Sequence, residues 1–199
     1  MNFDQVPLLE NTRVLLRPFL DSDKAELREI ALDEEIWRYM ITRISNEEEL
    51  NDWIQTAITG YQLGTRYTFM IVDKATGQLA GSTSYGNISV PDKRLEIGWT
   101  WLSKAYRGTG LNRHCKFLLL RYSFEVLQME RVELKGDAVN MRSRKAMLKI
   151  GATEEGILRS HTLMHDGRRR DTIYYSILRP EWEQIKNSVF KDLVEPHQA

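Results

Sequence analysis

The chain has 199 residues, of which 42% are hydrophobic and 28% are charged. This balance predicts one ordered domain over 1–199, with a core at about 13–185 and a C-terminal helix and tail at 180–199. Basic and acidic residues both number 28, so no net field favours nucleic acid or an anionic membrane, and we expect neither as a partner. The chain shows no apolar run of the roughly 18 residues that a membrane span needs and no signal-peptide pattern at its start, so we expect a cytoplasmic protein.

Strand and helix patterns alternate along the first half of the chain. Residues 12–19 predict a strand, after which Asp21, Ser22 and Asp23 offer N-caps for a helix to about Leu32. A second helix is expected from Asn46, because apolar residues recur on one face and acids fill the first turn. Residues 66–73 and 79–88 then predict a hairpin around a turn with Gly77.

The second half continues the alternation. Aromatic and apolar residues over 95–102 predict a central strand, which is followed by a helix over 111–128. A strand over 131–137, a short helix over 140–150, two strands around the turn 165–168 and a helix opened by Pro180 complete the chain. The pattern indicates a mixed α/β (α+β) fold.

Cysteine usage excludes an internal disulfide and a cysteine-based zinc cluster, since Cys115 is the only cysteine. It lies in an apolar helical pattern, and the adjacent His114 would diverge from it on a helix. We therefore interpret Cys115 as a structural thiol rather than a nucleophile.

A glycine-containing loop lies between the strand over 95–102 and the next helix, with the sequence Arg107-Gly108-Thr109-Gly110-Leu111-Asn112. Unpaired amides and the positive end of the helix dipole converge at such a junction, which makes it an anion site. A Walker loop would need Gly-Lys-Ser/Thr, and a dinucleotide loop would need glycine at Arg113. An ordinary strand-to-helix turn with two glycines is the alternative reading.

The stretch over 95–159 resembles the Gcn5-related N-acetyltransferases (GNAT), most strongly their RimJ/RimL-like branch, in the order, spacing and type of its residues. The resemblance covers nearly the whole chain from Arg13. It implies a central mixed, mostly antiparallel sheet, flanked by helices, with a V-shaped split between two parallel strands. It also implies acetyl-CoA as co-substrate, no metal, and a monomer or homodimer.

The resemblance assigns the coenzyme A site to two motifs. The glycine loop would cradle the pyrophosphate, and the main chain of Trp101 and Leu102 would lie beside the thioester. Asn112 departs from the small residue of the family pattern, so its side chain either turns outward or makes an additional hydrogen bond. Asn140 would bind the pantetheine or phosphate region, and Ser143 would approach the departing sulfur; Asn140 is equally an ideal helix N-cap. Basic residues flank the motifs as further phosphate contacts or as solvated helix faces: Lys104, Arg113, Lys116, Arg142, Arg144 and Lys145.

The resemblance and the positions of the titratable residues suggest the catalytic groups. Glu96, on the strand leading to the thioester, is the first candidate for the general base, with a cross-sheet ion pair as its structural alternative. His161 is the second candidate, although a lone histidine on a strand is more often structural. Ser143 is the candidate acid, or the residue that orients a water toward the thiolate. Trp37, Tyr39, Tyr85 and Trp99 are candidates for the acceptor side, unless they belong to the core.

The function expected from the resemblance is transfer of acetyl from acetyl-CoA to a primary amine, on a protein N-terminus or on a small molecule. Two alternatives stay open. In the first, the enzyme uses a longer acyl-CoA as its donor. In the second, the protein binds acyl-CoA as a sensor and does not catalyse transfer.

Overall fold

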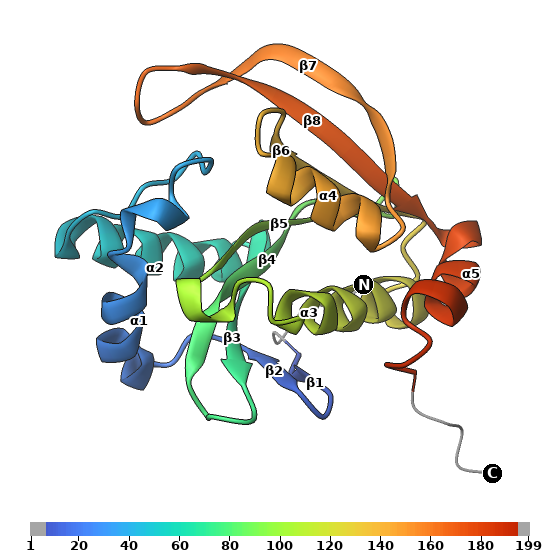
Figure 1. The fold of residues 1–199 in the computed structure, drawn as a ribbon, viewed down its shortest axis with the longest axis horizontal. Coiled ribbons are helices and arrows are strands. Elements are labelled where there is room, and N and C mark those ends of the chain that lie inside the picture. Colours follow the sequence, from blue (N-terminus) through green and yellow to red (C-terminus); the bar gives the residue numbers. More distant parts are fainter. Residues whose placement is uncertain (1–6, 195–199) are drawn as a thin grey trace.

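The computed structural model describes residues 7–194, so the signal-peptide comparison at residues 1–6 and the tail at 195–199 lie outside the described residues. Helices and strands follow one another as the sequence predicts (Figure 1). In chain order they are β1 (Leu9–Glu10), β2 (Val14–Arg17), α1 (Lys24–Ala31), α2 (Glu47–Gln62), β3 (Arg66–Asp73), β4 (Leu79–Ser89), β5 (Arg94–Leu102), α3 (Leu111–Arg121), β6 (Arg131–Asp137), α4 (Met141–Lys149), β7 (Thr153–Leu163), β8 (Arg169–Leu178) and α5 (Arg179–Val189).

The described strands form one sheet in the order β1-β2-β3-β4-β5-β6-β8-β7. Its neighbours are antiparallel except β5 and β6, which run parallel and pair only over Arg94, Leu95 and Glu96. Beyond Glu96 both strands continue without pairing to each other, β5 to Leu102 and β6 to Asp137. The expected mixed sheet with a V-shaped split between two parallel strands is therefore confirmed.

Helices cover both faces of this sheet. α1 and α2 pack on one face in a cluster that contains Leu27, Trp53, Met70 and Trp101. α3, α4 and α5 contribute to the larger cluster on the other face (Figure 1). The two clusters follow from the period-2 alternation of the strands, which sends neighbouring side chains to opposite faces.

Helix ends follow the sequence signals only in part. Asp21–Asp23 form a 3₁₀ turn before α1, and the Asp23 carboxylate binds Arg17 and the Leu20 amide, so the prediction of a side-chain N-cap for α1 was wrong. The Asn46 side chain accepts from the Glu49 amide at 2.9 Å, so it caps α2 as expected. The helix predicted over 111–128 differs in its last part, because α3 passes into a π-helical turn over Tyr122–Val126. This turn directs the Ser123 hydroxyl to the Tyr85 hydroxyl at 3.2 Å.

The hairpin of β7 and β8 arches away from the rest of the sheet, above α4 in Figure 1. Its tip reaches back to the segment after α1, where His165 Nε2 lies 3.2 Å from the Trp37 carbonyl oxygen. Arg168 forms an ion pair with the buried Asp137 at the end of β6. These contacts join the hairpin tip to the segment after α1 and to the end of β6.

Candidate functional site

The glycine loop lies between the end of β5 and the start of α3. Gly108 and Gly110 adopt left-handed backbone, with φ of +80° and +88°, and a Cβ on either would meet nothing within 4 Å. Within residues 7–194, the amides of Gly108, Gly110 and Asn112 have no main-chain acceptor. The loop therefore presents open space and unpaired N–H groups at the positive end of a helix, as an anion site requires.

Two side chains of the loop make hydrogen bonds or ion pairs with neighbouring protein groups. Arg107 donates from Nε to the Leu102 carbonyl oxygen at 2.9 Å, and its guanidinium lies 3.9 Å from the Asp33 carboxylate. Thr109 donates to the Tyr106 carbonyl oxygen at 2.9 Å. Because these side chains are engaged within the protein, the loop would hold a phosphate through its main chain.

Asn112, in the first turn of α3, does not point into solvent. Its Oδ1 is buried and has no hydrogen-bond partner in the described part of the chain. A buried acceptor of this kind calls for a donor. An amide or hydroxyl of coenzyme A would supply one, so the residues of this loop fit that ligand.

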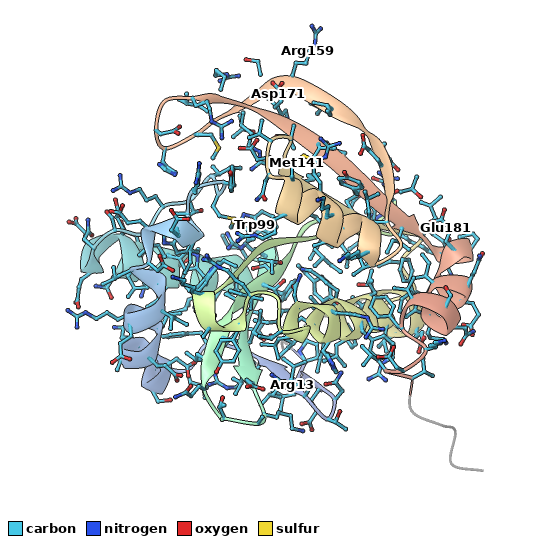
Figure 2. The ribbon with its side chains drawn as sticks, in the orientation of Figure 1. Arg13, Trp99, Met141, Arg159, Asp171 and Glu181 are labelled. Carbon is cyan, nitrogen blue, oxygen red and sulfur yellow. The ribbon has the colours of Figure 1, made fainter. Side chains whose placement is uncertain are left out.

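β5 is irregular where it leaves the split. Ser82 pairs with Trp101 and Ser84 with Gly98, so Trp99 and Thr100 lie opposite one residue of β4, which is a β-bulge. Trp99 has φ of +50°, unusual for a bulky residue, and its ring leaves no room for a Cβ at Gly86. Figure 2 shows Trp99 near the middle of the view, below the β7–β8 hairpin. The ring is half-buried, and its place on the acceptor side stays a prediction.

An arginine covers this tryptophan. The Arg66 guanidinium carbon lies 4.6 Å from the Trp99 ring centroid, and Arg66 Nε donates to the Ser84 hydroxyl at 3.3 Å. Burial lowers the pKa of Arg66 to about 10, although the charge of Glu96 opposes this shift. The Arg66 guanidinium, which is partly desolvated, therefore covers the Trp99 ring at the bulge through a cation–π contact.

Lys116 supports the bulge from α3, on the other face of the sheet. Its Nζ donates to the Thr100 hydroxyl at 2.7 Å and lies 3.4 Å from the Thr83 hydroxyl. The residue is 5% exposed, and burial lowers the pKa of its ammonium group to about 8. Lys116 therefore faces the sheet and does not flank the loop as a phosphate contact.

Glu96 occupies the last paired position before β5 and β6 diverge. Its Oε2 accepts from Asn87 Nδ2 at 2.6 Å and forms an ion pair with Lys135 at 2.8 Å. Its Oε1 turns over Gly98, 2.7 Å from the position that a Cβ would take there. One carboxylate oxygen is therefore held by two partners, while the other lies over Gly98.

Lys135 links the acids of this face. It binds Glu133 at 3.2 Å as well as Glu96, and its ammonium lies 4.7 Å from the Tyr174 ring centroid. Burial acts to lower the pKa of Lys135, but hydrogen bonds and charges from the two glutamates outweigh it and raise the pKa. The cross-sheet ion pair expected as the structural alternative for Glu96 is present.

Asn140 is a helix cap, as its structural alternative proposes. Its Oδ1 accepts from the Ser143 amide at 3.1 Å at the start of α4. The Ser143 hydroxyl lies against β6, 3.5 Å from a Cβ position built at Gly136. α4 thereby brings Ser143 next to the β6 side of the split.

Two aromatic residues expected on the acceptor side belong to the core instead. Tyr85 is fully buried, and its hydroxyl donates to the Leu119 carbonyl oxygen at 2.6 Å. The ring of Trp37 is 1% exposed, and its Nε1 donates to the Ala31 carbonyl oxygen at 2.7 Å. The prediction was wrong for both side chains, because their position in the chain does not reveal which face of the fold they occupy.

Tyr39 and His161 lie nearer the surface. Tyr39 is half-buried, and the Arg38 guanidinium lies over its ring at 5.4 Å. His161 is exposed on β7; its Nδ1 lies 3.1 Å from the Thr172 hydroxyl, and its ring meets Tyr174 edge-on at 6.0 Å. His161 thus shares a face with Glu96 but is separated from it by Tyr174 and Lys135.

The flanking basic residues divide into two groups. Arg113 is paired with Asp192 at 2.5 Å and Arg144 with Glu154 at 3.3 Å, so both are engaged within the fold. The other three are exposed and have no ion pair within residues 7–194: Lys104, Arg142 and Lys145.

Cys115 is fully buried, and burial raises the pKa of its thiol to about 12, in agreement with a structural role. The described residues contain no group of three metal-ligating side chains. None of the helices in that same part of the chain is both long and apolar enough to cross a membrane.

Sequence reasoning missed several residues that shape this region, namely Arg66, Lys135 and Arg170. A signal existed for one of them. Arg131, Glu133 and Lys135 alternate with apolar residues, which is typical of a strand with one polar face. Nothing local in the sequence marks Arg66 or Arg170, whose surroundings come from distant segments.

Known proteins share this architecture. A family model described as "Acetyltransferase (GNAT) domain" matches residues 13–153. The Bacillus subtilis protein named "Putative ribosomal N-acetyltransferase YdaF" is 36% identical over 110 residues, which cover 55% of this chain and 59% of that relative, less than two thirds of its length. "Uncharacterized N-acetyltransferase YoaA" of the same organism is 27% identical over 175 residues, 87% of this chain and 98% of the relative.

Solved structures agree. A GCN5-related N-acetyltransferase from Brucella melitensis superposes with a TM-score of 0.87 at 26% identity, over 96% of this chain and 87% of that one. The ribosomal-protein-S5-alanine acetyltransferase from Vibrio fischeri shares the fold, with a TM-score of 0.73 at 19% identity over 88% and 98% of the two chains. From the matched family, the split sheet and the glycine loop, we conclude that the chain belongs to the GNAT acetyltransferases.

Proposed function

We propose that this protein transfers the acetyl group of acetyl-CoA to a primary amine by direct attack within a ternary complex. The observation that carries the proposal is the split between β5 and β6, which opens beside the unpaired amides of the glycine loop. Pyrophosphate bound at that loop would direct the pantetheine arm into the split, where it would extend toward Glu96. A covalent enzyme intermediate is not required.

The main chain of β5 supplies the charge stabilisation in this proposal. Beyond Glu96 the strand has no partner on the β6 side, so amides between Trp99 and Leu102 are available on that edge. An N–H donated to the thioester carbonyl would stabilise the negative charge that develops as the amine attacks. Trp101 and Leu102 thus act through their backbone.

Proton movements are assigned to two side chains. Oε1 of Glu96 would accept the proton of the attacking ammonium, directly or through a water. The Ser143 hydroxyl would donate a hydrogen bond to the departing thiolate. An α-amine, with a pKa near 8, needs less help from Glu96 than a lysine amine near 10.4.

The name of YdaF, a putative ribosomal N-acetyltransferase, favours an amine of a ribosomal protein as the acceptor, and we propose its N-terminal α-amine; a small-molecule amine satisfies the same chemistry. In this proposal Tyr39, Trp99 and the Arg66 side chain that covers Trp99 would contact the acceptor.

Calorimetric titration with acetyl-CoA tests the cofactor site. We expect micromolar binding that is lost in Gly110→Trp, because the new ring would fill the space in front of the loop. Gly77→Trp is the matched control, since Gly77 also has positive φ and open surroundings but lies in the β3–β4 turn. An equal effect of both changes, or no binding by the wild type, would refute the site.

Transfer itself is then tested with amine acceptors and a panel of acyl-CoA donors. Acetyl transfer supports the proposal. Faster transfer from longer acyl-CoA molecules would indicate the alternative donor, and binding without any transfer would indicate a sensor.

A further inference from the structure

Arg170, on β8, is a buried arginine without a partner. It is 7% exposed, its Nε is buried and unsatisfied, and within residues 7–194 its guanidinium makes no hydrogen bond or ion pair. Its two neighbours are engaged: Arg168 with Asp137, and Arg169 with the main chain and hydroxyl of Ser160. Arg170 is thus the unsatisfied member of the run of three.

Arg170 lies on the face of the sheet that the proposed function assigns to the acceptor. Strand alternation places Arg170 with Thr172 and Tyr174, opposite the core residues Ile173 and Tyr175. Tyr174 contacts Lys135, which in turn binds Glu96. Arg170 therefore points to the same side of the sheet as the proposed base.

Nearby acids do not neutralise Arg170. Burial lowers the pKa of its guanidinium, while the charges of Asp137 and Glu96 act in the opposite direction, which places both carboxylates in its surroundings. Asp137 is committed to Arg168 and to the Val139 amide. Oε2 of Glu96 is committed to Asn87 and Lys135. Neither acid forms an ion pair with Arg170.

The end of the β7–β8 hairpin contains a buried residue and contacts the segment after α1. Met164 is 3% exposed, and His165 reaches the Trp37 carbonyl oxygen. A guanidinium held in such a place without a counter-charge is costly, since burial of an unpaired charge is among the strongest destabilising effects in proteins. A carboxylate from outside would remove that cost, because the guanidinium fork matches its two oxygens.

We propose that the acceptor amine carries a carboxylate, which Arg170 binds while the amine lies at Glu96. This inference rests on the proposed acetyl transfer. The carboxylate would be the free end of an amino acid or short peptide, or an acidic side chain near a protein N-terminus.

Paired acceptors test the inference and separate the two sources. One pair is a dipeptide and its C-terminal amide; the other is a short amidated peptide with glutamate or glutamine as its second residue. In at least one pair, kcat/KM should be about 10- to 100-fold higher for the carboxylate member, mainly through KM, as expected for a charged hydrogen-bonded pair. The pair that responds identifies the source.

Variants assign the preference to Arg170. R170M should bring the preference close to one, and R170K should retain part of it, since lysine keeps the charge but not the fork. R159M is the matched control, because Arg159 is on the same hairpin but points outward (Figure 2), and it should keep the full preference. Melting temperatures would show whether each variant is folded.

Each outcome decides between the two proposals. If no acceptor is acetylated, the proposed function fails. If acetylation occurs but the wild type treats both members of each pair alike, only the role of Arg170 fails. A preference that survives in R170M also overturns that role, as does an undiminished preference in R170K when R170M does not fold.

Discussion

Lys116 Nζ lies 2.7 Å from the Thr100 hydroxyl, so a desolvated ammonium group on α3 donates a hydrogen bond to the bulge of β5. No carboxylate pairs with this ammonium within residues 7–194. The cost of burying it appears as the lowered pKa, about 8 instead of 10.5. Such an arrangement stabilises the shape of the bulge at the expense of global stability.

Lys116→Met should therefore increase the free energy of unfolding at pH 7 by about 2 kcal/mol, after subtraction of the lost hydrogen bond to Thr100. The folded-state pKa lies below the unfolded value, so the cost is complete below pH 8 and disappears as pH rises to 10.5. Urea denaturation at pH 7 and pH 10 measures the difference. Lys145→Met, at an exposed lysine of α4, should show no such pH-dependent gain. An equal gain at both pH values would disprove the assignment.

Glu96→Gln should reduce kcat about 100-fold at pH 6 to 7, the usual scale for a general base. The loss should shrink as pH passes the acceptor pKa, near 8 for an α-amine, because a neutral amine needs no base. A pH profile of kcat measures this. Lys135→Met breaks the same ion pair but keeps the carboxylate, so a loss as large as that of the glutamine variant would indicate that the ion pair matters rather than the base.

Gly98→Ala should displace the Glu96 carboxylate, because the new methyl group would lie 2.7 Å from its Oε1. The side chain is flexible, so we expect little change in melting temperature but a fall in kcat. Binding of acetyl-CoA, measured by calorimetry, should stay the same. Unchanged kcat would show that the position of Oε1 is irrelevant to transfer.

Tyr85→Phe tests the placement of Tyr85 in the core. Loss of its hydrogen bond to the Leu119 carbonyl oxygen should lower the free energy of unfolding by about 1 kcal/mol. The acceptor KM should not change, because the ring lies between the sheet and α3. A raised KM at unchanged stability would restore Tyr85 to the acceptor side.

Much of the fold was predictable because its signals are local. The strand over 131–137 and the cap at Asn46 depend on residue patterns within one element, and both are confirmed. The glycine loop could be found because strand, glycines and helix are consecutive in the chain. Its two positive-φ residues suit glycine alone.

The remainder depends on contacts between distant segments. Trp37 and Tyr85 resemble pocket residues in the sequence, and only the packing of α1 and α3 on the sheet makes them core. The bulge at Trp99 arises from its register with β4, which no pattern within β5 discloses. The reach of His165 to Trp37 depends on the length and curvature of the whole hairpin, so sequence spacing could not reveal it.

The short pairing between β5 and β6 also has a mechanical consequence. Three residue pairs, from Arg94 to Glu96, connect the two halves of the sheet and act as a hinge. On the opposite side, the contact between His165 and Trp37 joins the hairpin tip to the segment after α1, and we call this contact the clasp. Opening the clasp would let the halves separate while the hinge stays intact. Amide hydrogen exchange should therefore be faster at the hairpin tip than at the hinge, and a ligand wedged between the halves should slow both.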